Sequence, residues 1–313
     1  MKSYAHALLL LTVIACPVAA QEPQCQSFNA QAQAACNTMV DATKAFHPLA
    51  GMILSGGNPV LGSAGTLGGF GHVSATIRIN AIKASLPNPD SAAQNPVPSS
   101  FDGYLPAPVI EAAIGLYRGQ GGGLLSIDGL ASAVLLPATR VQGMSVDPDA
   151  PKIGDVALGL GYGVRIGLLR GAFPVPSVSV SVMKRHVPRV QFGDVAGGDP
   201  ADFATDFDAV NWRATAGMRV LFADVAAGVG IDHYTSAATI HYFDGVTTHT
   251  VTLDLANTRE ILFANAGLTM GLVKLVAELG YQTGTDQSFA TTFSDFDPKA
   301  GHVFWGAGLR INF

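Results

Sequence analysis

The stretch DVALGLGYGVRIGL, residues 155–168, carries the clearest structural pattern in the sequence. Every second residue from Val156 to Leu168 is apolar, and the positions between them hold alanine, glycine and Arg165. Side chains of a β-strand alternate between two faces, whereas those of a helix repeat every 3.6 residues. The stretch is therefore expected to form a strand with one continuous apolar face.

The same alternation recurs along most of the chain. It is found in nine further segments, which begin near residues 73, 110, 125, 177, 210, 225, 262, 273 and 303. Their second face holds mainly Gly, Ala, Ser and Thr, whereas a face exposed to water would be rich in charged residues. Small side chains suit a narrow barrel lumen, with lipid outside. The fold class predicted is all-β: a transmembrane antiparallel up-and-down barrel of ten strands, or up to twelve if the glycine-rich segment 51–71 adds strands.

Loop lengths support the same architecture. Short connections are expected near residues 118–123, 170–176, 221–224 and 271. Long ones are expected at 86–108, 137–154, 190–208 and 284–300, and around the turn at 244–245. Outer-membrane barrels pair short periplasmic turns with longer outer loops. The alternation therefore predicts that both termini lie in the periplasm.

The last residues, GAGLRINF (306–313), resemble the terminal strand of Gram-negative outer-membrane β-barrels. The resemblance implies that Leu309, Ile311 and Phe313 form the signal read by the barrel assembly machinery. It also implies a location in the bacterial outer membrane, with membrane lipid and lipopolysaccharide as partners. Trp212 and Trp305 near the outer strand ends fit an aromatic girdle. The fold alone does not specify an activity.

The first 20 residues have the features of an export signal. Lys2, an apolar run and the small residues 18–20 predict a signal peptide over residues 1–20. A lipoprotein lipidated on Cys16 is the alternative. Cys25 and Cys36 remain as a pair in an oxidising compartment, so we expect a disulfide between them.

Residues 21–71 are expected to precede the barrel in the periplasm. The segment 29–45 is rich in helix formers and predicts a helix that stops before Pro48. The glycine-rich segment 51–71 predicts a linker or a plug, loosely similar to the plug of long-chain fatty-acid transporters, where an Asn-Pro pair also occurs (here Asn58-Pro59). The barrel is assigned to residues 72–313.

Alternation places a set of ionisable residues in the lumen: Arg78, Glu111, Asp128, Arg165, Arg213, Arg219, Asp232, Lys274, Glu278 and Arg310. One interpretation is a ladder of internal ion pairs that stabilises the barrel. The other is a slightly basic, narrow pore. The leading functional hypothesis is a porin-like passive transporter of a small or hydrophobic solute. The alternative is a structural or surface-interaction barrel that acts through its long loops.

Other functions find less support in the sequence. Only 13% of residues are charged, the net charge is −5 and no basic cluster occurs, which argues against nucleic-acid binding. No G-x-S-x-G motif is present, and Asp232 and His233 must point to opposite faces. We therefore predict no catalytic residue, cofactor or metal centre, with a lipid-modifying or proteolytic rim activity left open. Acidic residues in the long loops leave a loop-bound Ca²⁺ open as well.

Overall fold

The computed structural model describes residues 22–26, 28–88, 91–121, 123–137, 144–171, 174–199 and 201–313. The predicted signal peptide, including Cys16, lies outside the described residues.

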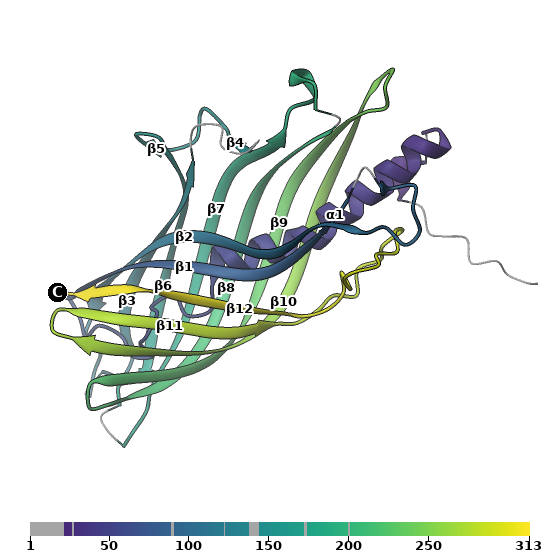
Figure 1. Ribbon diagram of the computed structural model, residues 1–313. Helices are drawn as coiled ribbons and strands as arrows, with labels where there is room; N and C mark the ends of the chain where they lie inside the picture. The colour runs from purple at the N-terminus through teal and green to yellow at the C-terminus, as the bar shows by residue number, and fades with distance from the viewer. Residues whose placement is uncertain are drawn as a thin grey trace, which may run out of the picture.

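Ten long strands of the described chain form one closed antiparallel barrel (Figure 1). They are β1 Val73–Pro87, β2 Ser99–Tyr117, β3 Ser126–Pro137, β6 Val156–Leu169, β7 Ser177–Gly193, β8 Ala201–Val220, β9 Ala223–Phe243, β10 Thr248–Met270, β11 Val273–Gln282 and β12 His302–Asn312. Neighbours in sequence pair with each other, and β12 pairs with β1 to close the wall. Two short strands, β4 Met144–Val146 and β5 Lys152–Ile153, extend β7 and β6 at the long-loop end. The prediction of a ten-stranded barrel is confirmed.

The alternation in β6 sets its two faces as expected. Tyr162 and Leu160 point outward and are 68% and 48% exposed, whereas Arg165 points inward and is 1% exposed. The inward glycines make room for neighbouring chain segments. A Cβ on Gly167 would lie 2.4 Å from Ser126 Oγ, so a side chain here would displace its neighbours.

Several strands are much longer than predicted, and the loop predicted at 190–208 is largely strand. Strand β10 shows the reason. From Leu262 to Met270, toward the short-turn end, its outward residues are mainly apolar. From Thr250 to Glu260, toward the long-loop end, most outward residues are polar, and inward residues such as Val251 and Leu253 are apolar. The backbone pairing continues while the pattern inverts, because the upper wall faces water outside and a helix inside. A search for apolar residues at every second position therefore finds only the part of this strand from Leu262 onward.

Aromatic residues mark both edges of the apolar belt. Trp212, Tyr281 and Trp305 are exposed on the outer face, and the rings of Tyr104 and Trp305 lie 6.4 Å apart. Phe313 lies at the end with the short turns. The eight steps from Trp305 to Phe313 span roughly 26 Å at about 3.3 Å per residue. Because the strands of such barrels tilt by about 35–45°, this length corresponds to a height of roughly 20 Å, somewhat less than the apolar band of about 25 Å.

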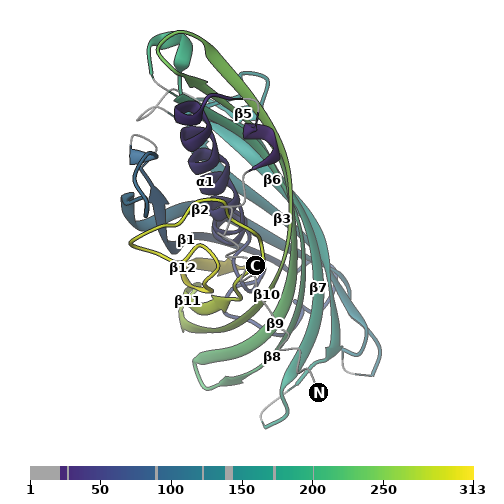
Figure 2. The ribbon, with the colours of Figure 1, turned by 90° about the vertical axis from the view of Figure 1, so that its right-hand side faces the viewer.

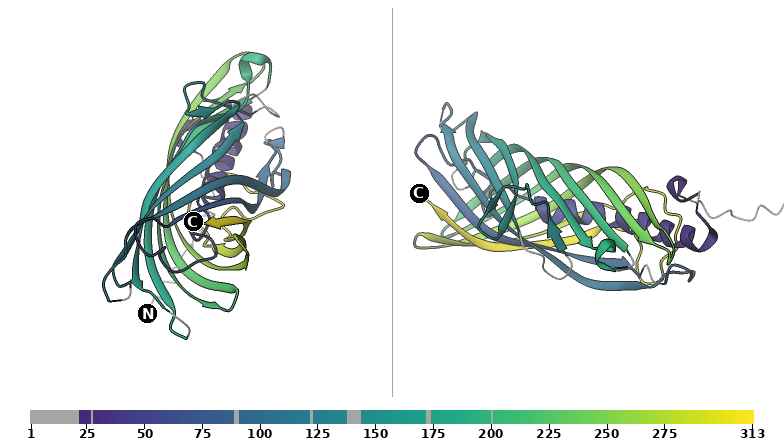
Figure 3. Two further views of the ribbon diagram at one scale, coloured as in Figure 1. Left: turned by 90° about the vertical axis from the view of Figure 1, so that its left-hand side faces the viewer. Right: turned by 90° about the horizontal axis from the view of Figure 1, so that it is seen from above.

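One long helix, α1 Ala30–Ser55, lies inside the ring of strands and extends past them at the long-loop end (Figures 1 and 3). The Asn29 side chain caps it by accepting a bond from the Ala32 amide at 3.0 Å. None of the helices in the described residues is long and apolar enough to cross a membrane.

The predicted helix end before Pro48 is wrong. Proline removes one backbone hydrogen bond, but the following turns pack inside the barrel. Leu49 and Met52 are buried in one cluster with Phe207 and Phe263 of the wall. Tertiary burial therefore extends the helix beyond its local sequence signal. The helix also occupies the lumen, whereas the sequence predicted it outside the barrel in the periplasm.

The predicted disulfide between Cys25 and Cys36 is confirmed, with the two Cα atoms 5.7 Å apart. It joins α1 to the short helix η1 Pro23–Cys25. Both cysteines pack against the long-loop ends of β9 and β10. The first described residues and Phe313 therefore lie at opposite ends of the barrel (Figures 1 and 3), which differs from the expectation that both termini share one side. Figure 2 looks along the barrel from the long-loop end, where α1 lies within the ring of strands.

Candidate functional site

Residues 56–71 run down the lumen from the end of α1 to the start of β1, and we call this segment the plug. Its irregular backbone leaves many N–H and C=O groups without partners of its own. Wall side chains supply those partners. Glu278 of β11 accepts bonds from the Gly57 and Asn58 amides at 2.8 and 2.7 Å.

The carboxyl end of α1 is bound by cationic and amide groups of the wall. Asn80 donates to the Ile53 carbonyl at 2.8 Å, and Arg78 donates to the Ser55 carbonyl at 3.2 Å. Arg213 donates to the carbonyls of Gly56 and Gly57 at 2.8 and 2.7 Å. The last carbonyls of a helix lack partners and carry a partial negative charge. Buried cations at this point therefore hold the helix end in the centre of the barrel.

The lower plug is held in the same way. Arg310 and Lys274 donate to the carbonyls of Leu61 and Gly62, each at 3.2 Å. Asp128 accepts from the Leu67 amide at 3.1 Å. The wall thus binds the plug from its top to its lower end.

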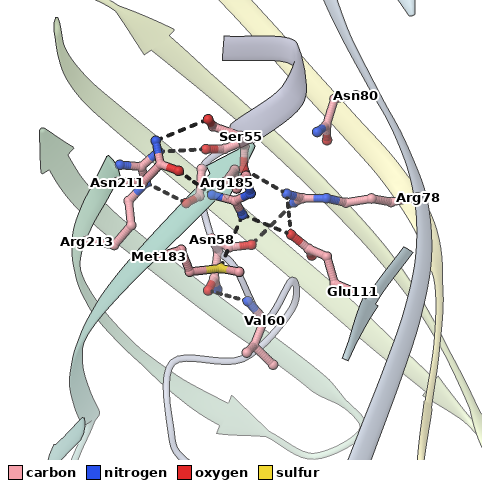
Figure 4. A network of polar contacts seen from close by, with 12 residues as sticks. Ser55, Asn58, Val60, Arg78, Asn80, Glu111, Met183, Arg185, Asn211 and Arg213 are labelled. Carbon is pink, nitrogen blue, oxygen red and sulfur yellow. Dashed lines mark hydrogen bonds and ion pairs between the residues drawn. The ribbon is translucent and has the colours of Figure 1, made fainter. Parts of the chain in front are cut away.

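Acidic wall residues neutralise the buried arginines (Figure 4). Arg78 lies 2.9 Å from Glu111 and 3.6 Å from Glu278. Arg185 lies 3.5 Å from Glu111. In the rest of the lumen Arg165 pairs with Asp128 at 2.7 Å, and Arg213 pairs with Asp232. Buried charges require such pairing, because removal from water is costly.

Most of the residues predicted for the lumen lie there. Arg78, Glu111, Asp128, Arg165, Arg213, Asp232, Glu278 and Arg310 are each at most 4% exposed, as is Lys274. They bind the plug and each other, so in this state they do not line an open channel. Arg219 is an exception: its side chain is 66% exposed at the barrel rim, where it pairs with Asp224 at 3.2 Å. The alternation predicts which face of the strand Arg219 lies on, but not that it lies at the barrel rim, close to the end of β8.

The sequence also missed lumen residues. Arg185 and Asn211 are buried in the network of Figure 4, and both carry the inward parity of their strands. Extending the parity of Ser177 and Ser181 along β7 reaches Arg185 directly. The outward face turns polar at Lys184, so the alternation of apolar residues ends before Arg185.

A largely apolar pocket of about 450 Å³ opens between α1 and the upper wall. Helix residues Met39, Ala42 and Phe46 form one side. The opposite sides come from β1, β2, β7, β8 and β9. Pockets of about 300–1,000 Å³ are typical of small-molecule sites. The sequence did not predict this pocket because it depends on the helix lying inside the barrel.

Asp202 is the one ionisable residue among the described residues that line the pocket, but its pairing with His241, and that of His241 with Thr250, places its side chain on the outer face of the wall. It is 7% exposed. One carboxylate oxygen lies 2.6 Å from His241 Nδ1, and the other accepts from the Val195 amide at 3.2 Å.

The β11–β12 connection, residues 283–301, joins α1 on the face away from the pocket. Asp41 is fully buried and accepts a bond from the Thr291 amide at 2.6 Å. Burial raises the pKa of Asp41 to about 7, although the bond from Thr291 opposes the shift. Lys44 lies 2.5 Å from Glu22 and 3.9 Å from Asp41. We call Glu22, Asp41, Lys44 and Thr291 the latch.

No three His, Cys, Asp or Glu side chains come together as a metal-binding group in the part of the chain that the structure describes. The loop-bound Ca²⁺ therefore finds no ligand cluster there. Asp232 is buried in the lumen, and His233 is exposed on the outer face. These two residues do not form a shared site.

The closed antiparallel wall, the apolar outer belt and the inward ion pairs define the fold class of this protein: it is a transmembrane β-barrel of the outer-membrane type. No family model and no curated protein matches the sequence. Among solved structures, the outer membrane protease OmpT from Escherichia coli is 13% identical, covers 78% of this chain and 97% of its own, and gives a TM-score of 0.43.

Two further solved structures are similar at the same low level. The translocator domain of the autotransporter NalP from Neisseria meningitidis is 11% identical, covers 87% of this chain and 98% of its own, and gives a TM-score of 0.46. The attachment invasion locus protein Ail of Yersinia pestis is 11% identical, covers 77% and 98%, and gives a TM-score of 0.30. These likenesses concern the fold, and the three names denote different activities.

Proposed function

We propose that this barrel is a passive transporter that takes up a small, largely apolar solute through the pocket at its long-loop end. The observation that carries the proposal is the pocket of about 450 Å³ between α1 and the upper wall. Apolar side chains such as Met39, Phe46 and Leu105 line it, so the transfer of an apolar solute from water into the pocket would be favourable.

The plug supports a gated route rather than an open pore. Residues 56–71 accept or donate hydrogen bonds to buried side chains of seven strands: β1, β3, β7, β8, β10, β11 and β12. These contacts support a lumen that is closed to ions in this state. In the proposed cycle the solute binds beside α1, and passage to the short-turn side requires the plug to shift.

The orientation is part of the proposal. Short turns face the periplasm and long strand extensions face the outside, as is usual for such barrels. The pocket would then receive its solute from the outside of the cell. The belt from Trp305 to Phe313 would lie in the bilayer.

Two measurements test the proposal together. The purified barrel in planar bilayers should pass no steady ion current, because the plug closes the lumen. The same protein in amphipol should bind the apolar fluorophore N-phenyl-1-naphthylamine. Ala42→Trp fills the pocket and should abolish saturable binding, whereas Ala264→Trp on the exposed outer belt should leave it unchanged.

The outcomes separate the alternatives. Steady conductance by the wild type would show an open pore and refute the closed plug. Equal fluorophore binding by both tryptophan variants would refute the assignment of the pocket as the binding site. A barrel that neither conducts nor binds the fluorophore would favour surface interaction through its extended long-loop end.

A further inference from the structure

Two short turns of the barrel carry large apolar side chains at their tips. Strands β8 and β9 are joined by Leu221 and Phe222, which are 86% and 64% exposed. Strands β10 and β11 are joined by Gly271 and Leu272, and Leu272 is 83% exposed. Both turns lie at the end of the barrel that holds the C-terminus (Figure 1). Large apolar side chains that gather on one exposed surface indicate contact with a membrane or a partner.

The backbone of the turns does not account for leucine at these positions. Leu221 has a φ of 57°, in the left-handed region, and so has Leu125 in the β2–β3 connection. Leucine rarely adopts this conformation because its Cβ is crowded by the backbone, and hairpin turns usually place Asn, Asp or Gly there. Leu125 is also 55% exposed. A side chain that is strained at the backbone and packs against no core points to an apolar contact outside the molecule.

The height of the apolar surface agrees with such a contact. The belt described above, which ends with the last strand residues, is shorter than the hydrocarbon band. In β8 and β11 the turn leucine lies nine residues from the outer aromatic residue, from Trp212 to Leu221 and from Leu272 to Tyr281. At about 3.3 Å per residue and a tilt of about 40°, this length gives a height of roughly 23 Å. The turn leucines therefore bring the apolar surface close to the full band of about 25 Å.

The same end of the barrel has an excess of positive charge. Asp224 is the one acidic residue among the described residues of 118–125, 170–176, 219–224 and 270–274. It lies 2.5 Å from Lys274 and 3.2 Å from Arg219, so it is already shared by two cations. Arg118 and Arg170 are exposed, and neither forms an ion pair within the part of the chain that the structure describes. These two arginines are therefore free to bind an external anion.

We propose that the short turns insert into a phospholipid leaflet and that Arg118 and Arg170 bind anionic headgroups at its surface. Leu221, Phe222 and Leu272 then lie among the first carbons of the acyl chains, where their burial is favourable. The long arginine side chains reach from the turns to the phosphate groups. This surface is separate from the pocket beside α1 and does not rest on the proposed transport.

The depth of the turns is tested by fluorescence quenching in vesicles of phosphatidylcholine brominated near the carbonyl end of its acyl chains. Trp212→Phe and Trp305→Phe remove both native tryptophans, and Leu221→Trp or Leu272→Trp then provides the single fluorophore. We expect strong quenching and blue-shifted emission at both positions. Val246→Trp is the matched control, since Val246 is 87% exposed on the β9–β10 hairpin at the opposite end, and it should not be quenched.

The outcome is read only from barrels whose migration shifts on heating, so that a folding defect is not mistaken for a result. Leu221→Trp and Leu272→Trp emission that resembles that of Val246→Trp would place the turns in water and overturn the proposal. Such a result would favour a protein partner at this end instead.

The headgroup contact is tested with Leu124→Trp in the same background, because Leu124 belongs to the same β2–β3 connection as Arg118. We expect brominated phosphatidylglycerol to associate about 5-fold more strongly than brominated phosphatidylcholine, the ratio that one arginine near the lipid surface predicts. Arg118→Gln combined with Arg170→Gln should bring the ratio to about 1. Lys152→Gln, on exposed β5 at the long-loop end, should leave it unchanged. Equal association of the two lipids before the arginines are replaced, or a preference that survives their replacement, refutes headgroup binding by these residues.

Discussion

We expect the latch to make the stability of the folded barrel dependent on pH, and Asp41→Asn isolates this effect. The pKa of Asp41 rises from 3.8 to about 7 in the folded protein because the carboxyl is buried. The folded state therefore binds more protons than the unfolded state between these values. Stability from this group is full below pH 3.8 and is lost as the pH rises through about 7. A rise in pKa from 3.8 to about 7 corresponds to roughly 4 kcal/mol, since each tenfold change in the protonation equilibrium amounts to about 1.4 kcal/mol.

Asparagine keeps the size of the side chain and an acceptor for the Thr291 amide but cannot ionise. We expect Asp41→Asn to be more stable than the wild type by up to about 4 kcal/mol near pH 8, with the difference disappearing near pH 4. Urea unfolding of the barrel in lipid vesicles across this range measures the difference. Asp254→Asn is the exposed control. A wild type that gains stability over Asp41→Asn as the pH rises would refute the reasoning.

Three further predictions concern the plug and the N-terminal loop. Arg213→Met leaves the buried carboxylate of Asp232 without its cation and should lower the free energy of unfolding by about 3–5 kcal/mol, with part recovered when Asp232→Leu is added. In Gly115→Ala the new Cβ would lie 2.1 Å from the Gly69 carbonyl oxygen, so we expect a loss of about 1–3 kcal/mol in urea unfolding. Gly129→Ala is its control, since its nearest neighbour lies at 3.3 Å, and equal losses would contradict the overpacking argument. Removing the disulfide should cost about 3 kcal/mol and speed hydrogen exchange in the first turns of α1; unchanged exchange would contradict its anchoring role.

The lower barrel could be predicted from the sequence because one simple rule governs it. Outside the wall is hydrocarbon and inside is a crowded lumen, so apolar and small or polar residues alternate strictly, as they do from Val156 to Leu168. The same parity placed Arg78, Glu278 and Arg310 in the lumen.

The upper barrel could not be predicted by that rule. Its wall has water outside and an apolar helix inside, so Val251 and Leu253 point inward although outward positions were expected to be apolar. The position of α1 is also a tertiary property, since Pro48 signals a helix end locally. The pocket and the latch depend on that position and were therefore missed.

The path of the chain through the lumen constrains the order of assembly. The disulfide-closed loop lies at one end of the barrel, yet the same chain enters β1 at the other end, after the plug. If the barrel closed first, the helix and its disulfide-closed loop would have to pass through the closed barrel, past a series of buried charges. Closing the seam between β1 and β12 around a helix already in place avoids that passage. The N-terminal segment thus acts as a template on which the wall is wrapped, and sealing of the seam becomes the final step of folding.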